Sequence, residues 1–178
     1  MSEEKVRKDK LKEVVKGLKS DDNKEIIKSL RALKIYGDAS ASPQIFHLLL
    51  NHHDDEVGEE VMKLLASLKD TQMESILIDA VKNQKYKDIQ QLLLSSMWQS
   101  GLNFSEHLLT LVEIALEGDF MVQVECVTII ENLEGPFQEE HIMESLLKLN
   151  NFFDQNVSDE RKEKLMKELT IIIKDFQS

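Results

Sequence analysis

The fold is decided by one stretch, Asp54-Asp-Glu-Val-Gly-Glu-Glu-Val-Met-Lys-Leu-Leu-Ala-Ser-Leu-Lys-Asp70. Its apolar residues recur at spacings of three and four, the period of a helix with one apolar face. They are Val57, Val61, Met62, Leu64, Leu65 and Leu68. The charged residues Glu56, Glu59, Glu60 and Lys63 occupy the other side. The stretch therefore predicts an amphipathic helix.

The same apolar pattern recurs along the chain about every 32 residues. A shift of 32 residues toward the N-terminus overlays Leu30, Leu33 and Tyr36 on it. Shifts toward the C-terminus overlay first Ile89, Leu93, Leu94 and Met97, and then Val122, Cys126, Val127, Ile130 and Leu133. Another amphipathic stretch precedes each of these helices, and two helices per period are typical of an α-solenoid.

We therefore expect an all-α protein, an α-α superhelix (solenoid) of about five antiparallel helix pairs in a single helical-repeat domain over residues 1–178. The expected pairs are approximately 3–37, 42–69, 71–101, 104–135 and 138–177. The second helices of three pairs are followed by Gly37, Gly101 and Gly135, where a left-handed C-cap would lie. Thr71-Gln-Met-Glu74 has the pattern of a capping box. In the last pair, the pattern predicts a helix over 139–149 and a loop over 150–157.

Asp54-Asp-Glu-Val57, followed by Val61, Leu64, Leu65 and Leu68, resembles the second helix of a HEAT repeat. The resemblance covers roughly residues 8–135 and implies a stack of helix pairs. Members of that family usually carry an arginine directly after the valine, where it reaches an aspartate in a neighbouring repeat. Here that position is Gly58, which leaves HEAT, armadillo and other helical-repeat relatives open.

Composition restricts the setting in which the chain works. No run approaches the roughly 18 to 20 apolar residues of a membrane span, and Met1-Ser-Glu-Glu-Lys lacks the apolar segment of a signal peptide. We expect a cytoplasmic protein without a membrane partner. The single cysteine, Cys126, lies in an apolar column and is expected to be a small core residue. Trp98 either closes a core between helices or serves as an exposed anchor in a binding groove.

The net charge of −11 is distributed unevenly. Residues 1–34 contain 11 basic and 7 acidic side chains, whereas residues 35–178 contain 11 basic and 26 acidic ones. The segment 88–147 has 11 acidic residues and neither lysine nor arginine. Such a surface either keeps the protein soluble or attracts a partner of opposite charge.

The leading hypothesis is a non-enzymatic protein-protein interaction or scaffold module. Its acidic concave face, lined by the second helices, would bind a protein or peptide with a basic segment. The candidate partner-binding residues are Glu56, Glu59, Glu60, Asp88, Gln91, Ser95, Gln123 and Glu125. We expect these side chains to be exposed. We expect no catalytic residue, no cofactor, no metal and no nucleic-acid partner.

Two further hypotheses follow from the same charges. An acidic inhibitor or decoy would neutralise a basic toxin or imitate nucleic acid. A HEAT-like DNA repair glycosylase would need a basic concave face, but basic residues are concentrated in the first pair. His52 and His53 beside Asp54 and Asp55 are interpreted as turn residues, because metalloprotease histidines are spaced i and i+4. The apolar run Ile171–Ile173 suggests either a homodimer contact through the C-terminal helix or contact with a further repeat.

Overall fold

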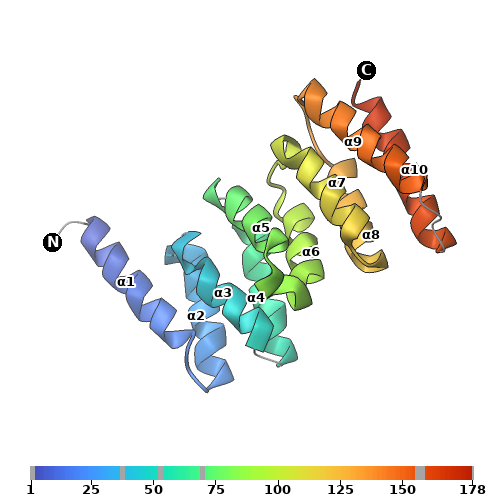
Figure 1. Cartoon of the computed structure of the whole chain (residues 1–178). Helices are drawn as coiled ribbons and strands as arrows, with labels where there is room; N and C mark the ends of the chain where they lie inside the picture. Colours follow the sequence, from blue (N-terminus) through green and yellow to red (C-terminus); the bar gives the residue numbers. More distant parts are fainter. Residues whose placement is uncertain (1–2, 37–38, 52–53, 69–70, 155–158, 178) are drawn as a thin grey trace. The chain divides into compact units, whose positions relative to one another are not determined.

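The computed structural model describes residues 3–36, 39–51, 54–68, 71–154 and 159–177, and these ranges are all-helical (Figure 1). They contain ten α-helices: α1 (Glu3–Gly17), α2 (Asn23–Tyr36), α3 (Ser42–Asn51), α4 (Asp55–Ser67), α5 (Gln72–Lys82), α6 (Gln90–Ser100), α7 (Leu108–Glu117), α8 (Phe120–Glu131), α9 (Glu139–Phe153) and α10 (Glu160–Asp175). Three 3₁₀ turns are η1 (Ala39–Ala41), η2 (Gln84–Ile89) and η3 (Ser105–His107). None of the described helices is both long and apolar enough to cross a membrane.

The helices pack in sequential pairs, α1 with α2 through α9 with α10, as the repeating pattern predicts. Each helix contacts its partner, and several also contact the helix two positions along the chain. The contacts divide the chain into two compact units, unit 1 (Met1–Gly101) and unit 2 (Leu102–Ser178). The expectation of a single repeat domain over residues 1–178 stays a prediction.

In unit 1, the second helices α2, α4 and α6 lie side by side, with α2 against α4 and α4 against α6. Most residues of the apolar columns read from the sequence form the core between the helices, whereas Met62 and Leu68 are only half-buried. Its fully buried members include Ile26, Leu30 and Leu33 of α2, Val61, Leu64 and Leu65 of α4, and Leu93, Leu94 and Met97 of α6. Each such side chain contributes about 1.5–3 kcal/mol by leaving water.

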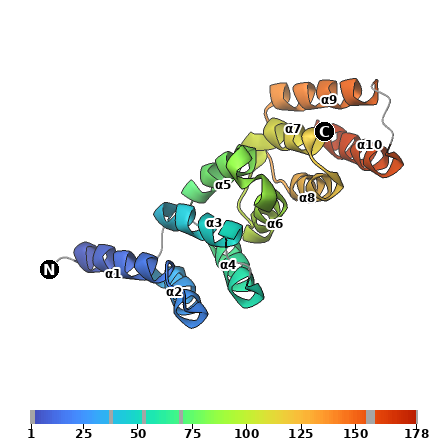
Figure 2. The ribbon, with the colours of Figure 1, turned by 60° about the horizontal axis from the view of Figure 1, so that its bottom comes forward.

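In unit 2, α7 packs beside α9 and α8 beside α10, as Figure 2 shows. The start of α10 is held on the turn between α7 and α8. Lys162 Nζ donates a hydrogen bond of 3.3 Å to the carbonyl oxygen of Gly118, and the Arg161 guanidinium lies 5.0 Å from the centre of the Phe120 ring. Cys126 is fully buried as expected, and burial raises the pKa of its thiol.

Several helix ends follow the sequence signals and others do not. Gly101 caps α6 in the left-handed conformation (φ 65°), whereas Gly37 lies outside the described residues. The expected left-handed cap at Gly135 is wrong, because α8 already ends at Glu131 and Asn132 caps it. Thr71 makes no side-chain capping bond and has helical backbone angles, so the capping box is wrong as well.

Helix α9 is longer than the sequence pattern predicts. It continues through residues 150–153 instead of ending at Leu149. The rings of Phe152 and Phe153 meet edge to face at 5.5 Å, and both side chains are half-buried. The aromatic pair therefore lies in the last turn of the helix, within part of the stretch that was expected to be a loop.

Candidate functional site: a groove along helix α4

The candidate site is a hollow of about 1080 Å³ that runs along one side of α4 in unit 1. We call it the α4 groove. Helix α4 supplies most of its lining, and α2, α3 and α6 supply the rest. The lining residues are Lys34, Leu49, Asp54, Asp55, Gly58, Glu59, Met62, Lys63, Ala66, Ser67, Leu92 and Gln99. Since α4 has 13 residues, the groove floor is about 20 Å long.

The sequence places α4 so that one face is buried and another lines the groove. Asp54 is the N-cap and accepts a hydrogen bond of 3.1 Å from the backbone N–H of Val57. The apolar column Val57, Val61, Leu64 and Leu65 is buried against the neighbouring helices. Groove residues such as Asp55, Gly58, Met62 and Ala66 follow one another at spacings of three and four, so they share another side of the helix.

Gly58 lies in the floor of the groove and leaves space above the helix. A Cβ atom added at this position would meet no other atom within 4 Å. Met62, one turn further along α4, is half-buried, and Leu92 on α6 is 41% exposed. The groove thus combines a side-chain-free position with apolar groups that remain accessible.

Charge changes sign along α4. Asp54, Asp55 and Glu59 line the part of the groove near its N-terminal end, and Lys63 lines the part beyond them. Lys63 Nζ lies 3.3 Å from Glu59 Oε2 and 3.6 Å from Glu60 Oε1. The ion pair engages Glu59 as well as Lys63, and Lys34 of α2 is a second basic residue in the lining. The acidic end of the groove, at Asp54 and Asp55, is therefore the part that would attract a basic partner first.

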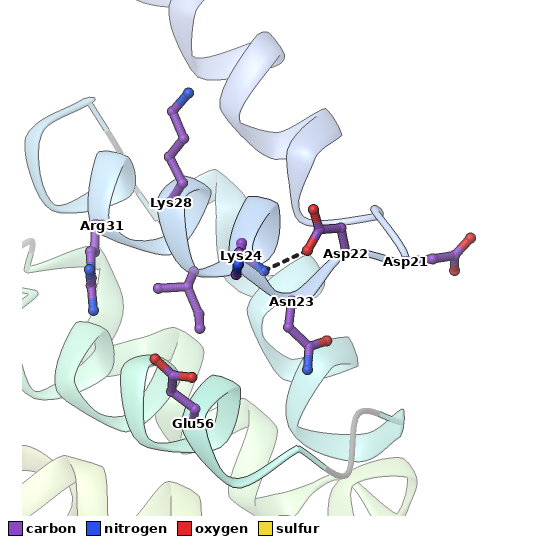
Figure 3. A pocket seen from close by; sticks show the side chains of 8 residues that line it. Asp21, Asp22, Asn23, Lys24, Lys28, Arg31 and Glu56 are labelled. Carbon is purple, nitrogen blue, oxygen red and sulfur yellow. Dashed lines mark hydrogen bonds between the residues drawn. The ribbon is translucent and has the colours of Figure 1, made fainter.

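A second hollow of about 690 Å³, which we call the α2 hollow, lies between α2 and α4 (Figure 3). It is lined by Asp21, Asp22, Asn23, Lys24, Ile27, Lys28, Arg31 and Glu56. Figure 3 shows Glu56 pointing from α4 toward α2 and Arg31 pointing from α2 toward α4. Asp22 is occupied in capping α2, because its Oδ1 accepts a hydrogen bond of 3.0 Å from the backbone N–H of Lys24.

An ion pair joins α2 to α4 at the α2 hollow, which Arg31 helps to line. Arg31 donates two hydrogen bonds to the Glu60 carboxylate, from Nε to Oε2 at 3.3 Å and from Nη2 to Oε1 at 3.1 Å. These hydrogen bonds lower the pKa of Glu60 and raise that of Arg31. A guanidinium and a carboxylate matched in this way fix the orientation of two helices. The arginine that links neighbouring pairs here is Arg31, whereas the HEAT pattern would have placed one at residue 58.

The candidates on α4 do not share one surface. Glu59 lines the α4 groove, Glu56 lines the α2 hollow, and Glu60 lines neither, because it faces Arg31 of α2. The expectation that Glu60 is exposed is wrong: the residue is 8% exposed and its carboxylate is held by Arg31 and Lys63. The sequence shows alternating charges on a helix but does not show which carboxylate faces the neighbouring helix.

The remaining candidates are distributed over both units. Asp88 is exposed but lies in η2, before α6 begins, because the backbone at Ile89 leaves helical angles. Gln91 is exposed on α6, and Ser95 is half-buried and accepts a hydrogen bond of 3.0 Å from Gln99, a groove residue.

The two candidates on α8, Gln123 and Glu125, belong to unit 2. The expected exposure of Gln123 is wrong, since it is only 1% exposed, while Glu125 is half-buried. The α4 groove is lined by none of the five candidates outside α4, which are Asp88, Gln91, Ser95, Gln123 and Glu125.

Of the residues that line the groove, only Glu59 was a candidate from the sequence, and Asp55 and Leu92 show what signal was available for the others. Asp55 lies four residues before Glu59, so helical spacing alone places the two carboxylates on one face and could have identified it. Leu92 stands next to the buried Leu93 and Leu94, and only the packing of α6 shows that it faces outward. His52 and His53 lie outside the described residues. Within the described ranges, no group of three His, Cys, Asp or Glu side chains could hold a metal ion.

No protein-family model matches the chain, and no curated protein matches it either.

Proposed function

We propose that the protein is a non-enzymatic interaction or scaffold module that binds a basic segment of another protein in the α4 groove. The observation that carries the proposal is the combination of accessible apolar side chains with Asp55 and Glu59 in one groove. Apolar contacts supply affinity, while carboxylates attract a basic partner and select its charge.

The proposal includes a HEAT-like solenoid built from the five helix pairs. The repeat spacing and the contacts of α2, α4 and α6 support it, because second helices that stack side by side form an extended binding surface. The remainder of the acidic surface attracts the partner at long range and the groove holds it.

A peptide selection followed by titration tests this proposal. A library of random dodecapeptides is displayed on phage, selected on the full chain at low salt, and the enriched peptides are synthesised. We expect them to be basic, and we expect their affinity to fall about tenfold in the double variant Asp55→Asn/Glu59→Gln, as measured by isothermal titration calorimetry. Binding should also weaken as salt is raised, because the carboxylates are near the surface.

Helix α9 offers a matched control. Glu140 and Glu144 are exposed and have the same i, i+4 spacing as Asp55 and Glu59, beginning in the first turn of their helix as well. The variant Glu140→Gln/Glu144→Gln changes the net charge equally, so it should weaken binding by less than about twofold, through long-range attraction alone.

The opposite result would favour the alternative function. If the α9 variant lost the peptide and the α4 variant retained it, the acidic stretch 88–147 would carry the binding, as an acidic inhibitor or decoy requires. Equal affinity of all three proteins for the peptides would contradict an electrostatic site in either place.

A further inference from the structure

Three of the glycines that the structure describes, Gly17, Gly101 and Gly118, have a structural reason for being glycine that does not apply to Gly58. Gly101 has a positive φ of 65°, a conformation that other residues seldom adopt. At Gly118, a Cβ would lie 2.8 Å from Val122 Cβ and 3.0 Å from the carbonyl oxygen of Ile114. At Gly17, the side chain of Ser29 occupies the space that a Cβ would need.

Gly58 shares neither of these reasons. It lies within α4 with its N–H bonded to the carbonyl oxygen of Asp54 at 3.0 Å, and a Cβ would meet nothing within 4 Å. Glycine weakens a helix relative to alanine, because it loses more backbone entropy on folding. Nothing that the structure describes near Gly58 compensates for this loss.

The surroundings of Gly58 suit the tip of an apolar side chain. Met62 lies one turn further along the same side of α4, and Leu49 and Leu92 line the groove from α3 and α6. Asp55 and Glu59 flank Gly58 at three residues before and one residue after it. An apolar group placed over the glycine would therefore have carboxylates close by on the same helix.

We propose that Gly58 is the floor of an anchor position, which receives one large apolar side chain of the bound segment while basic residues on either side of that anchor contact Asp55 and Glu59. The partner is thus a basic peptide segment with a leucine-, methionine- or phenylalanine-like residue among its lysines or arginines. The inference rests on the proposed function and adds the apolar anchor to it. Many interfaces concentrate their affinity in one large apolar side chain near the centre of the contact, from which the surrounding contacts exclude water.

Filling the recess from the protein side tests the anchor. The variant Gly58→Leu places a side chain where the partner's anchor would lie, and the open space above the glycine lets α4 fold around it. We expect the affinity for the selected dodecapeptides to fall at least about tenfold. Asn150→Leu adds the same side chain at an exposed site on α9 and should leave the affinity unchanged. Circular dichroism and thermal unfolding of both variants establish that they are folded.

The peptide side of the contact gives the complementary test. Each peptide is resynthesised with its apolar residues changed to alanine one at a time, and one change should reduce the affinity for the wild-type chain about tenfold. The same change should have little effect on the residual affinity for Gly58→Leu, because the recess is already filled. This double-mutant comparison connects one peptide residue to residue 58.

The outcomes separate the anchor from the proposed function. If Gly58→Leu binds as well as the wild type while Asp55→Asn/Glu59→Gln binds more weakly, the anchor is wrong and the acidic groove stands. If neither variant changes the affinity, the proposed function fails together with the anchor. If the alanine change on the peptide weakens binding to the wild type and to Gly58→Leu equally, the apolar residue of the peptide does not lie over Gly58. That result would overturn the proposed anchor position.

Discussion

Helices α4 and α9 carry similar charges but present them differently. Both begin with carboxylates in the first turn, and both have a second carboxylate four residues later. On α4 the exposed face is part of a groove, and the apolar Met62 is half-buried in it. On α9 the exposed face carries Met143 and Leu147, which are 66% and 60% exposed. The comparison shows that acidic sequence alone does not identify a binding site, because the site also depends on the shape that neighbouring helices give to the surface.

The two units also differ in how their charges are balanced. Residues 1–101 contain 16 basic and 17 acidic side chains, whereas residues 102–178 contain 6 and 16. In unit 1 a carboxylate is held between helices, because Arg31 of α2 pairs with Glu60 of α4. Unit 2 has a corresponding link in Lys148 of α9 and Glu113 of α7, whose charged atoms lie 3.0 Å apart. Most of the unbalanced charge of the protein therefore belongs to unit 2, while the groove that we propose as the site belongs to unit 1.

The largest expected difference is in the free energy of unfolding, between a substitution on the buried face of α4 and one on the exposed face of α9. Leu64 is fully buried, so Leu64→Ala should lower the free energy of unfolding by about 2–5 kcal/mol, through lost burial and the cavity that remains. Leu147→Ala, on the exposed face of α9, should change it by less than about 0.5 kcal/mol. Urea denaturation followed by circular dichroism measures both. Equal losses would mean that the helix faces are assigned incorrectly.

Two glycines provide the next comparison. Gly118→Ala should destabilise the protein by about 1–3 kcal/mol, because the new Cβ would collide with Val122 and the carbonyl of Ile114. Gly58→Ala should instead stabilise it by about 0.5 kcal/mol, since the Cβ enters open space and the helix gains propensity. The difference in thermal midpoint between the two variants is the measurement. A destabilising Gly58→Ala would show that the open recess is not open in solution.

The third comparison distinguishes a carboxylate between helices from one on the surface. Glu60→Gln should cost about 1 kcal/mol at neutral pH, because it weakens the charged hydrogen bonds from Arg31. Glu144→Gln should cost only a few tenths, since that side chain is exposed.

The effect of Glu60 should depend on pH in a defined direction. Arg31 lowers the pKa of Glu60 in the folded protein below the ordinary value of 4.5, so the contribution to stability is present above that value. It is lost as the pH falls through the lowered pKa, and the wild type and Glu60→Gln should then converge. Denaturation curves between neutral pH and about pH 3 measure this, and a difference that grew toward acid would contradict the ion pair.

Much of the fold could be predicted because its signals are local and periodic. The positions of Leu33, Leu65, Met97 and Ile130 follow one apolar column, and all four are buried. Asp159 caps α10 by accepting a hydrogen bond of 3.0 Å from the backbone N–H of Arg161, as a short acidic residue before a helix predicts. Thr71 is also a short polar residue before a helix, but its side chain does not cap α5, because its own backbone is already helical.

The site was less predictable, because it depends on which side of a helix meets its neighbour. Glu59 and Glu60 are adjacent in the sequence, yet one lines the groove and the other is 8% exposed beneath Arg31. A triple change of Glu56, Glu59 and Glu60 to lysine would also break the Arg31–Glu60 ion pair. A loss of binding in that variant could then come from a loss of stability. Asp55 and Glu59 are the carboxylates whose replacement tests the groove alone.

The central claim, that a basic segment binds along α4, is tested most directly by mapping where a bound peptide lies. Backbone amide resonances of the full chain are followed by NMR while a selected dodecapeptide is added. We expect the largest shifts to fall within 54–67 and 92–99, centred on Gly58, and the amides of α9 to stay nearly unchanged. Shifts concentrated on α9 or elsewhere in Leu102–Ser178 would contradict the claim and place the partner on the acidic surface of unit 2.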